Sequence, residues 1–530
     1  MKGFFKSAVF LAVAGLIAKI IGAVYKVPLV AVLGAEGIGV YQLVFPMYTT
    51  LLTLASGGIP QAVSRATARS AAEGRKGESR RLLAVSMLSL TAIGLVGSAL
   101  LALCGSAVAR AQGNGMAATA YVALAPSVLL VSVLAAFRGW WQGQNNMFPT
   151  AISQLIEQIV KLVAGLWLAA ALMPMGVEWG VAGAAAGITL SELLAVALLA
   201  CGLLIRKFKR GKNKTPFDEE NPDDAQTAEN TVKTKTSVLL GEIYKSALPI
   251  SFGSLIMPLL QLIDSVMIVN ILVAGGLTAA AATSLYGIAG APVAAIVNLP
   301  PVITAAVAAA AMPRFTAAAA RGESGAHVAD EAMRYAHVVG IGGGVMIAFF
   351  APELLTALYS GGLTGAQISL AASIMRISAV GVPYVCYMQI VTTYLQAKGR
   401  AHVPAFNLLV GGALKASLTA LLLMTVGIEG SAIATVCAYA LTLALDFAAV
   451  GGQLRGVPWQ PLAGAVASTG VAVAVSGILR FIPSLSPILS AAIGVGTYGL
   501  VFVIMLAVTR TVDMRGLLAL KLKNNHVGMC

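Results

Sequence analysis

The stretch AGLIAKIIGAVYKVPLV, residues 14 to 30, places two lysines inside a run of apolar residues. Such a run forms a helix that lies most favourably in the hydrocarbon core of a membrane. An ammonium group at the centre of a bilayer costs at least ~2.5 to 3.5 kcal/mol to insert. Lys19 and Lys26 are therefore candidate functional residues, because a charge in that position is rarely kept without a use.

The rest of the chain is as apolar as this stretch. Of 530 residues, 58% are hydrophobic and 11% are charged, and the mean hydropathy is +0.86, which is typical of integral membrane proteins. Runs of roughly 20 apolar residues, each able to cross a ~30 Å core as a helix, recur along the chain. The sequence predicts an all-α polytopic protein with about fourteen spans, centred near residues 18, 50, 92, 128, 161, 192, 258, 298, 346, 382, 416, 441, 470 and 498.

The net charge of +14 follows the membrane topology. With the N-terminus inside, most lysines and arginines fall in the inner loops and tails, and the outer side holds only Arg110 and Arg480. By the positive-inside rule both termini are predicted to be cytoplasmic, and no nucleic-acid partner is expected. Lys19 interrupts the apolar run that a signal peptide would need, so the first segment is predicted to stay as an uncleaved helix.

The pattern of charge and hydropathy divides the chain into five parts. Residues 206 to 236 change from basic to acidic to basic and read as a solvated linker. The predicted parts are an N-lobe at 1–205, a cytoplasmic linker at 206–240, a C-lobe at 241–457, an additional helix pair at 458–509 and a cytoplasmic tail at 510–530. The tail alternates leucines with basic residues, which favours a place on the inner membrane surface.

The two predicted lobes resemble each other in sequence. Equivalent residues follow in the same order at nearly one offset: Gln142 and Gln396, Pro149 and Pro404, Lys161 and Lys415, and the segments GVAGAA at 180–185 and GIEGSA at 427–432. Six spans in each half give both halves the same direction in the membrane, so the repeat is parallel. Such a repeat predicts two pseudo-symmetric six-helix lobes with a substrate cavity between them.

Polar residues inside the first span share one helical face. Gly15, Lys19, Gly22 and Lys26 follow the spacing that aligns residues on one stripe. The glycines remove bulk, as a helix requires where it lines a cavity or packs closely on a neighbour. Lys19 lies near the predicted middle of the membrane, which favours a water-filled cavity, whereas Lys26 is close enough to the outer end to reach the headgroups by snorkelling.

Two further spans carry aligned polar groups. The fifth sets Gln154, Glu157, Gln158 and Lys161 on one stripe, where a local ion pair between Glu157 and Lys161 is the alternative to a functional role. The seventh gathers Ser254, Gln261, Asp264 and Ser265, with Pro249 and Pro258 placed to kink or break the helix. Asp264 is expected to serve as an ion or proton site, or as the counter-ion of a lysine across the cavity.

Other intramembrane charges are Arg376, Lys415, Glu192 and Asp446, for which pairing between helices is an equal alternative. The cysteines and histidines show no metal-ligand or disulfide pattern. No phosphate-binding loop, metalloprotease motif or nucleophile elbow is present, so the chain is predicted not to be an enzyme. Transport would then be driven by a gradient of ions, potential or substrate. No cofactor is expected, and a coupling cation or proton is left open without being identified.

Three segments carry a resemblance to a known family: KIIGAVYKVPLVAVLGAEGIGVYQLVFPMYTTLLTLASGGIPQAVSR, RGWWQGQNNMFPTAISQLIEQIVKL and LQAKGRAHVP. The chain resembles the stage V sporulation protein B branch of the multidrug/oligosaccharidyl-lipid/polysaccharide exporter superfamily. The resemblance implies two lobes forming a V around a cationic cavity, which alternates between inward-open and outward-open states. It also implies a bacterial cytoplasmic-membrane flippase for undecaprenyl-linked sugars, including lipid II, and a surface-lying helix in the linker.

The leading interpretation is a monomeric flippase whose partners are the bilayer and a lipid-linked sugar pyrophosphate, acting in cell-envelope or spore-cortex assembly. The cavity cations would be Lys19, Lys26, Lys161, Arg376 and Lys415, and the ion-coupling candidates Asp264, Gln261, Glu157 and Gln154. A cation-coupled multidrug exporter of the same superfamily is the first alternative. A non-transporting membrane scaffold for envelope assembly is the second.

Overall fold

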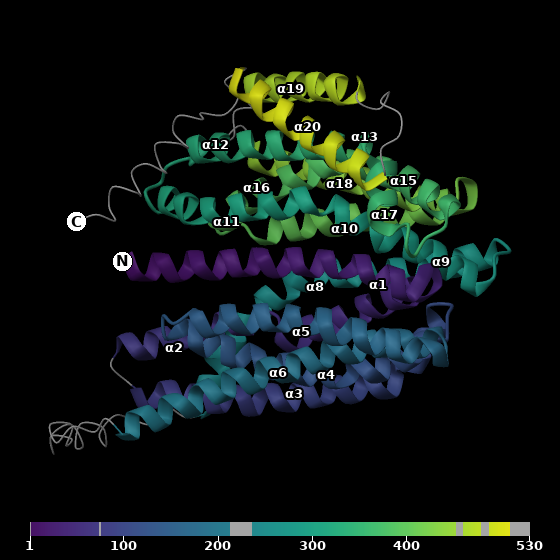
Figure 1. The fold of residues 1–530 in the computed structure, drawn as a ribbon. Coiled ribbons are helices and arrows are strands. Elements are labelled where there is room, and N and C mark those ends of the chain that lie inside the picture. Colours follow the sequence, from purple (N-terminus) through teal and green to yellow (C-terminus); the bar gives the residue numbers. More distant parts are fainter. Residues whose placement is uncertain (1, 74–75, 213–235, 452–458, 479–486, 509–530) are drawn as a thin grey trace, which may run out of the picture. The chain divides into compact units, whose positions relative to one another are not determined.

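The computed structural model describes residues 2–73, 76–212, 236–451, 459–478 and 487–508, and every regular element in these ranges is helical (Figure 1). This confirms the predicted all-α class. The middle of the predicted linker and the predicted tail lie outside the described residues, as does any surface helix between residues 213 and 235.

Thirteen helices in the described ranges are long and apolar enough to cross a membrane. The first two predicted spans form one element, α1 (Lys2–Ser56), which Gly34 divides by leaving helical geometry at φ 66° and ψ −173°. Glycine reaches this backbone conformation without the clash that a Cβ atom would cause. The predicted span near residue 470 is represented by α19 (Trp459–Ile478), whose apolar part, Ala463–Val475, is shorter.

The span predicted near residue 298 is two apolar helices in the structure. One is formed by α9 (Ala279–Gly290) and α10 (Pro292–Val297), and the other by α11 (Leu299–Ala320). The predicted centre of the span, near residue 298, is therefore the position of the break between these two helices. The break near residue 298 adds one helix, whereas the continuity of α1 and the short apolar part of α19 each remove one, so thirteen helices correspond to the fourteen predicted spans.

The chain forms two compact units. The first comprises residues 1–25 and 40–266, and the second comprises residues 26–39 and 267–530. Helix α1 thus contributes to both units: it begins in the first, supplies residues 26–39 to the second and returns. In the second unit, Gly39 and Gly287 allow this segment to approach α9, since a Cβ on Gly287 would lie 2.6 Å from the Cα of Gly39.

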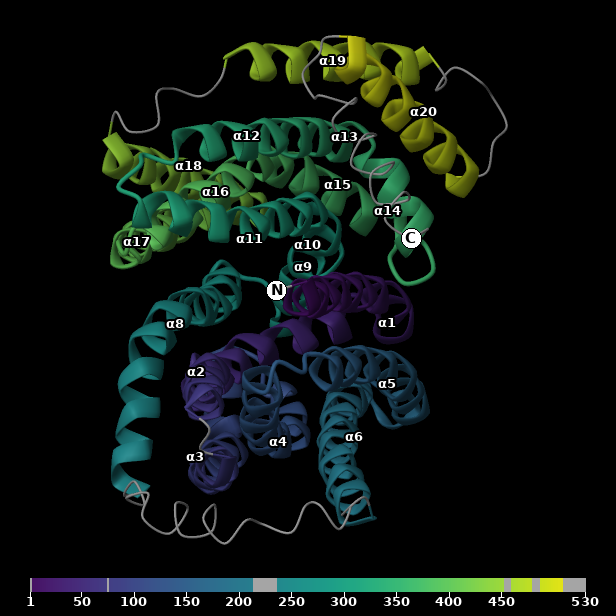
Figure 2. The ribbon, with the colours of Figure 1, turned by 90° about the vertical axis from the view of Figure 1, so that its left-hand side faces the viewer.

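The other helices of the first unit are α2 (Ile59–Ala72), α3 (Lys76–Ala111), α4 (Ala117–Gly143), α5 (Phe148–Leu172), the short η1 (Met173–Met175), α6 (Val177–Lys212) and most of α8 (Thr236–Ala274). Helix α8 continues through Pro249 and Pro258, so neither proline ends it. Figure 2 shows α2, α3 and α4 side by side, in agreement with their contacts.

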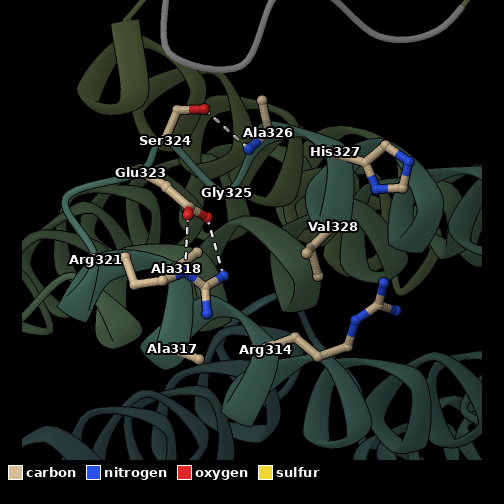
Figure 3. A pocket seen from close by; sticks show the side chains of 10 residues that line it. All are labelled: Arg314, Ala317, Ala318, Arg321, Glu323, Ser324, Gly325, Ala326, His327 and Val328. Atoms are coloured by element: carbon tan, nitrogen blue, oxygen red, sulfur yellow. Dashed lines mark hydrogen bonds and ion pairs between the residues drawn. The ribbon is translucent and has the colours of Figure 1, made fainter.

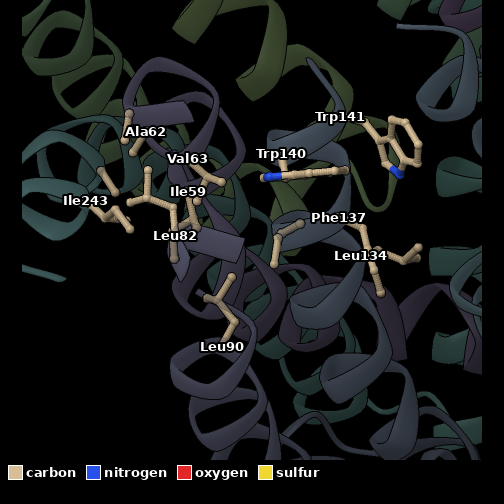
Figure 4. Close-up of a cluster of buried hydrophobic side chains, with 14 of the residues drawn as sticks. Ile59, Ala62, Val63, Leu82, Leu90, Leu134, Phe137, Trp140, Trp141 and Ile243 are labelled. Atoms are coloured by element: carbon tan, nitrogen blue, oxygen red, sulfur yellow. The ribbon is translucent and has the colours of Figure 1, made fainter. Parts of the chain in front are cut away.

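The segment RGWWQG of α4 contributes its two tryptophans to a hydrophobic cluster of this unit (Figure 4). Gly139 and Gly143 lie one turn apart on α4 and contact the backbone of α2 at Pro60 and Ser64. Trp140 and Trp141 are both buried beside them, and the Trp140 indole donates a hydrogen bond to the Ser79 carbonyl at 3.0 Å. The glycines therefore permit close helix packing, while the indoles fill the surrounding space.

The second unit continues with α12 (Ala326–His337), the π-helical turn η3 (Val338–Gly342), α13 (Gly343–Phe349), α14 (Ala351–Tyr359), α15 (Gly365–Val380), α16 (Val382–Ala397), α17 (His402–Thr425), α18 (Glu429–Val450), α19 and α20 (Pro487–Val508). The last two helices pack on each other and on this unit through an apolar cluster that includes Phe350, Tyr498 and Phe502. The Tyr498 hydroxyl also donates to the Gly342 carbonyl at 2.9 Å.

One helix-packing contact recurs in both units. A Cβ on Gly183 of α6 would lie 2.7 Å from the carbonyl carbon of Leu168 on α5, and one on Gly430 of α18 would lie 2.7 Å from that of Leu422 on α17. These glycines are equivalent positions of the repeat found in the sequence. Lys161 and Lys415 precede the two leucines by the same number of residues. The repeated sequence therefore specifies a repeated contact between neighbouring helices.

Candidate functional site

The ammonium group of Lys161 lies among aromatic rings of the first unit. Its Nζ atom is 5.4 Å from the ring centroid of Tyr25 and 5.8 Å from that of Phe45, both on α1. At these distances the ring faces attract a cation. Within the described residues no ion pair joins Lys161 to Glu157, although the two lie one helical turn apart on α5.

Glu157 is instead bound by Arg138, a residue of α4 that the sequence analysis did not single out. The guanidinium Nη2 lies 2.7 Å from Glu157 Oε2, and the side chains are 17% and 21% exposed. Arg138 also donates through Nε to Ser153 Oγ at 3.1 Å. The pair keeps the carboxylate of Glu157 next to a guanidinium, and Lys161 remains as a cation close to, but not bound by, an acid.

A second acid of this unit is held by hydroxyl groups. Glu192 on α6 is 3% exposed, and Tyr48 on α1 donates to its Oε1 atom at 2.8 Å. Ser127 on α4 donates to Oε2 and is 2.7 Å from the Tyr48 hydroxyl. The carboxyl group thus joins three helices. Lys161 interacts electrostatically with both Glu157 and Glu192.

The glycine stripe of α1 faces the glutamine stripe of α5. A Cβ on Gly15 would lie 3.9 Å from Gln154 Oε1, and one on Gly22 would lie 3.2 Å from Gln158 Oε1. The oxygen of Gln154 is buried and has no hydrogen-bond partner among the described residues. Lys19, between the two glycines in sequence, is exposed. Gly22 therefore permits close packing on α5, Gly15 leaves room for an ordinary contact with it, and the lysine of the same stripe is exposed.

The candidates of α8 differ in exposure. Asp264 is buried at 9% exposed, and Gln261 is exposed. The next residue, Ser265, accepts a hydrogen bond from Gln112 Nε2 at 2.9 Å. The amide of Gln112 also donates to the Leu43 carbonyl at 2.8 Å and accepts from the Tyr121 hydroxyl at 2.7 Å. This buried polar network fixes the part of α8 that carries Asp264.

The remaining predicted cations belong to the second unit. Lys26 is half-buried in the segment that α1 supplies to that unit, Arg376 is exposed on α15, and Lys415 is half-buried on α17. The predicted cavity cations are thus shared by both units, with Lys19 and Lys161 in the first.

Asp446 is the buried acid of the second unit. Asn407 Nδ2 donates to its Oδ1 atom at 2.8 Å. Its Oδ2 atom is buried without a hydrogen-bond partner within the described ranges. Over those ranges, no group of three or more His, Cys, Asp or Glu side chains is arranged to hold a metal ion.

This arrangement suits binding of an anion or exchange of a proton better than bond cleavage. The first unit holds one ammonium group near two carboxyl groups, each of which already has its own hydrogen-bond donors. Tyr25, Tyr48, Ser127 and Arg138 complete the set and were missed from the sequence. Arg138 lies near the end of α4 and Glu157 in the first half of the next helix, α5, so opposite charges on consecutive helices were the signal for this pair.

The polysaccharide biosynthesis protein family matches residues 4–319. Stage V sporulation protein B of Bacillus subtilis is 25% identical over 85% of this chain and 84% of its own length. Lipid II flippase MurJ of Bacillus subtilis is 28% identical over 47% of this chain and 46% of its own.

The fold is also found among solved structures. An inward closed conformation of lipid II flippase MurJ superposes with a TM-score of 0.70 at 13% identity, covering 95% of this chain and 98% of the other. The resemblance noted in the sequence is therefore confirmed in both sequence and fold. The chain belongs to the polysaccharide biosynthesis protein family.

Proposed function

We propose that this chain is a flippase that moves a saccharide linked to a polyprenyl pyrophosphate across the bacterial cytoplasmic membrane, with lipid II or a related envelope precursor as its substrate. The fold, shared along nearly the whole chain with a lipid II flippase, is the observation that carries the proposal. Membership of the polysaccharide biosynthesis family and the likeness to stage V sporulation protein B support it. The two units would exchange access to the two membrane faces.

Charge explains why such a substrate needs lysines. The pyrophosphate carries about two negative charges, and an ammonium ~4 Å from one of them gains ~4 kcal/mol at an effective dielectric constant near 20. This gain is comparable to the ~2.5 to 3.5 kcal/mol that a lysine costs at the bilayer centre. The attraction between the ammonium group and the pyrophosphate therefore offsets much of the cost of placing either charge inside the membrane. Lys19 is accessible, and Lys161 has aromatic neighbours that stabilise a cation without neutralising it.

The carboxyl groups near Lys161 support its role in binding phosphate, because each of them is already bound by other side chains. Arg138 binds Glu157, and two hydroxyl groups bind Glu192. A direct ion pair would cancel the charge of Lys161 and leave little attraction for a phosphate. The arrangement therefore preserves a positive charge within the first unit. Asp264, buried on α8, is the candidate for a coupling cation or proton.

Growth of a bacterium depleted of its own lipid II flippase tests the proposal. Expression of this chain should restore growth, and a Lys19→Ala variant present at equal membrane level should not. Restoration by neither, together with export of lipophilic cations that confers drug resistance, would favour the multidrug exporter. Growth restored equally by the parent and by variants lacking all five predicted cavity cations would keep the flippase and overturn the role of those cations. Growth restored by none of them, with no export of lipophilic cations, would favour the scaffold.

A further inference from the structure

A pocket of about 480 Å³ opens where α11 turns into α12, within the second unit (Figure 3). Its polar lining comes from Arg314 and Arg321 of α11 and its end, Glu323 and Ser324 of the turn, and His327 of α12. None of these residues belongs to the predicted cavity set.

The position of the pocket relative to the membrane follows from its two helices. Leu299–Ala320 and Ala326–Phe349 are both long and apolar enough to span. The turn between them, residues 321–325, therefore lies where the hydrocarbon core gives way to the polar headgroups. Lipid phosphates occupy that level, so they meet this pocket without leaving the bilayer.

The turn is held in place by buried groups. Gly325 adopts φ 71°, the left-handed conformation that glycine tolerates best. The Tyr394 hydroxyl of α16 donates to the Ser324 carbonyl at 2.8 Å. Tyr394 is 1% exposed, and its ring meets that of Phe315 edge to face at 5.4 Å. The turn that lines the pocket is therefore held in one conformation, which lowers the cost of ordering a ligand.

The charges of the lining favour an anion. Arg314 pairs with Glu331 at 2.7 Å through Nη1, and Arg321 pairs with Glu323 at 2.7 Å through Nε. Arg321 also donates through Nη2 to the second carboxylate oxygen of Glu323 at 3.0 Å, so this pair is bidentate, whereas the Arg314–Glu331 pair is a single exposed contact that contributes little to stability. Each guanidinium has five N–H groups and keeps donors beyond those pairs. The lining holds Arg314, Arg321 and His327 beside one carboxylate, that of Glu323, and the carboxylate of Glu331 lies next to Arg314.

Further groups add to this positive character. Helix α12 begins at the pocket and directs the positive end of its dipole into it. Lys398, on the turn after α16, stacks over the ring of Tyr394 at 4.8 Å and brings another cation to this end of the unit. Arginine binds phosphate oxygens in a bidentate manner that suits such a site.

We propose that this pocket binds the phosphate of an anionic phospholipid headgroup. The guanidinium groups of Arg314 and Arg321 hold the phosphate oxygens, His327 and the first turn of α12 close the site from the other side, and the acyl chains remain in the bilayer. The bound lipid fastens the turn between two spanning helices at the membrane surface. This site is separate from the proposed transport function and stands or falls without it.

Lipid binding to the purified full-length chain in neutral detergent tests the proposal. Native mass spectrometry would count retained phosphatidylglycerol, with phosphatidylcholine as the zwitterionic comparison, and thermal unfolding would report the shift in Tm. We expect phosphatidylglycerol to be retained and to raise Tm. The double variant Arg314→Gln/Arg321→Gln should bind it ~10-fold more weakly, since charge-assisted contacts are lost.

The control is Arg69→Gln, which removes an arginine of the first unit that is likewise exposed and paired with a glutamate, at 3.0 Å. It should bind lipid like the parent. Unchanged phosphatidylglycerol binding by the double variant would overturn the proposal. An equal rise in Tm with inorganic phosphate at the same concentration would also overturn it, because the pocket would then select a soluble ion. The single variant Arg321→Lys, which keeps the charge, should retain part of the binding and serves if the double variant does not fold.

Discussion

Arg138 binds Glu157 across two helices at 2.7 Å, and so separates that carboxylate from Lys161 one turn away on the same helix. Glutamate and lysine at this spacing would otherwise attract each other. The arginine therefore decides whether the first unit presents a free ammonium group. A residue outside the predicted site thus controls the charge of one inside it.

Removing that arginine should impair transport without touching Lys161. We expect Arg138→Gln to release Glu157, which then pairs with Lys161 and cancels its charge. The loss of the charge-assisted hydrogen bonds from Arg138 to Glu157 and Ser153 should lower stability by about 1 to 3 kcal/mol. Substrate accessibility on the outer leaflet would measure transport, and Tm would measure stability.

The double variant Arg138→Gln/Glu157→Gln supplies the control. It removes both partners, leaves Lys161 charged and should regain most of the transport lost in the single variant. If the double variant is as inactive as Arg138→Gln, the arginine acts on substrate or structure directly, and the separation of Glu157 from Lys161 is irrelevant.

The repeated glycine contact gives a prediction on stability. Gly183→Ala and Gly430→Ala should each lower stability by roughly 1 to 3 kcal/mol, because the new methyl group overlaps the backbone of Leu168 or Leu422. Gly470→Ala is the matched control: no atom lies within 4 Å of its Cβ position on α19, and alanine favours a helix. Thermal unfolding measures the Tm of each of the three variants. Equal Tm values for all three would refute the close contact.

These glycines also show which features of the fold could be predicted from the sequence. Hydropathy was enough to identify the apolar segments, because ~20 apolar residues have few alternatives to a helix in a membrane. The repeat of GVAGAA and GIEGSA pointed to equivalent positions without showing that each glycine admits a neighbouring helix. The break between α10 and α11 was read as the centre of a span, because both sides of it are equally apolar.

Contacts between side chains on different helices were the main feature that the sequence did not predict. The stripe on α5 predicted that Glu157 and Lys161 share a face, but the arginine that binds Glu157 lies on α4. Likewise, Glu192 was visible as an intramembrane acid, whereas Tyr48 and Ser127 look like ordinary polar residues until folding brings them to it. Helical periodicity describes one helix at a time, and the register between helices is set by packing.

The two buried acids of the first unit should behave differently. Asp264→Asn is expected to remove the dependence of transport on an imposed ion gradient while folded protein remains in the membrane, because an amide keeps the shape of the carboxylate without its charge. Glu192→Gln should leave that dependence intact, since the hydroxyl groups of Tyr48 and Ser127 already satisfy this acid as a structural group. Transport into vesicles with and without the gradient measures both. The opposite pattern would assign coupling to Glu192.

Lys19 provides the most direct test of the cationic account. It is exposed between two glycines that pack on α5, so its side chain adds charge to α1 and little packing. We expect Lys19→Ala to eliminate flipping and Lys19→Arg to retain most of it, because a guanidinium preserves the charge and also binds phosphate. Lys26→Ala should do less harm, since Lys26 lies closer to the predicted outer end of its span.

Substrate accessibility on the outer leaflet, measured in cells with equal membrane levels of each variant, separates these outcomes. Because Lys19 is exposed, its truncation should leave Tm close to that of the parent, so lost flipping would reflect lost charge. A pyrophosphate ~4 Å from the ammonium gains ~4 kcal/mol at a dielectric constant near 20, which corresponds to about a thousandfold change in rate when that gain arises at the transport barrier. Flipping by Lys19→Ala at the parental rate would show that the lysine serves snorkelling alone.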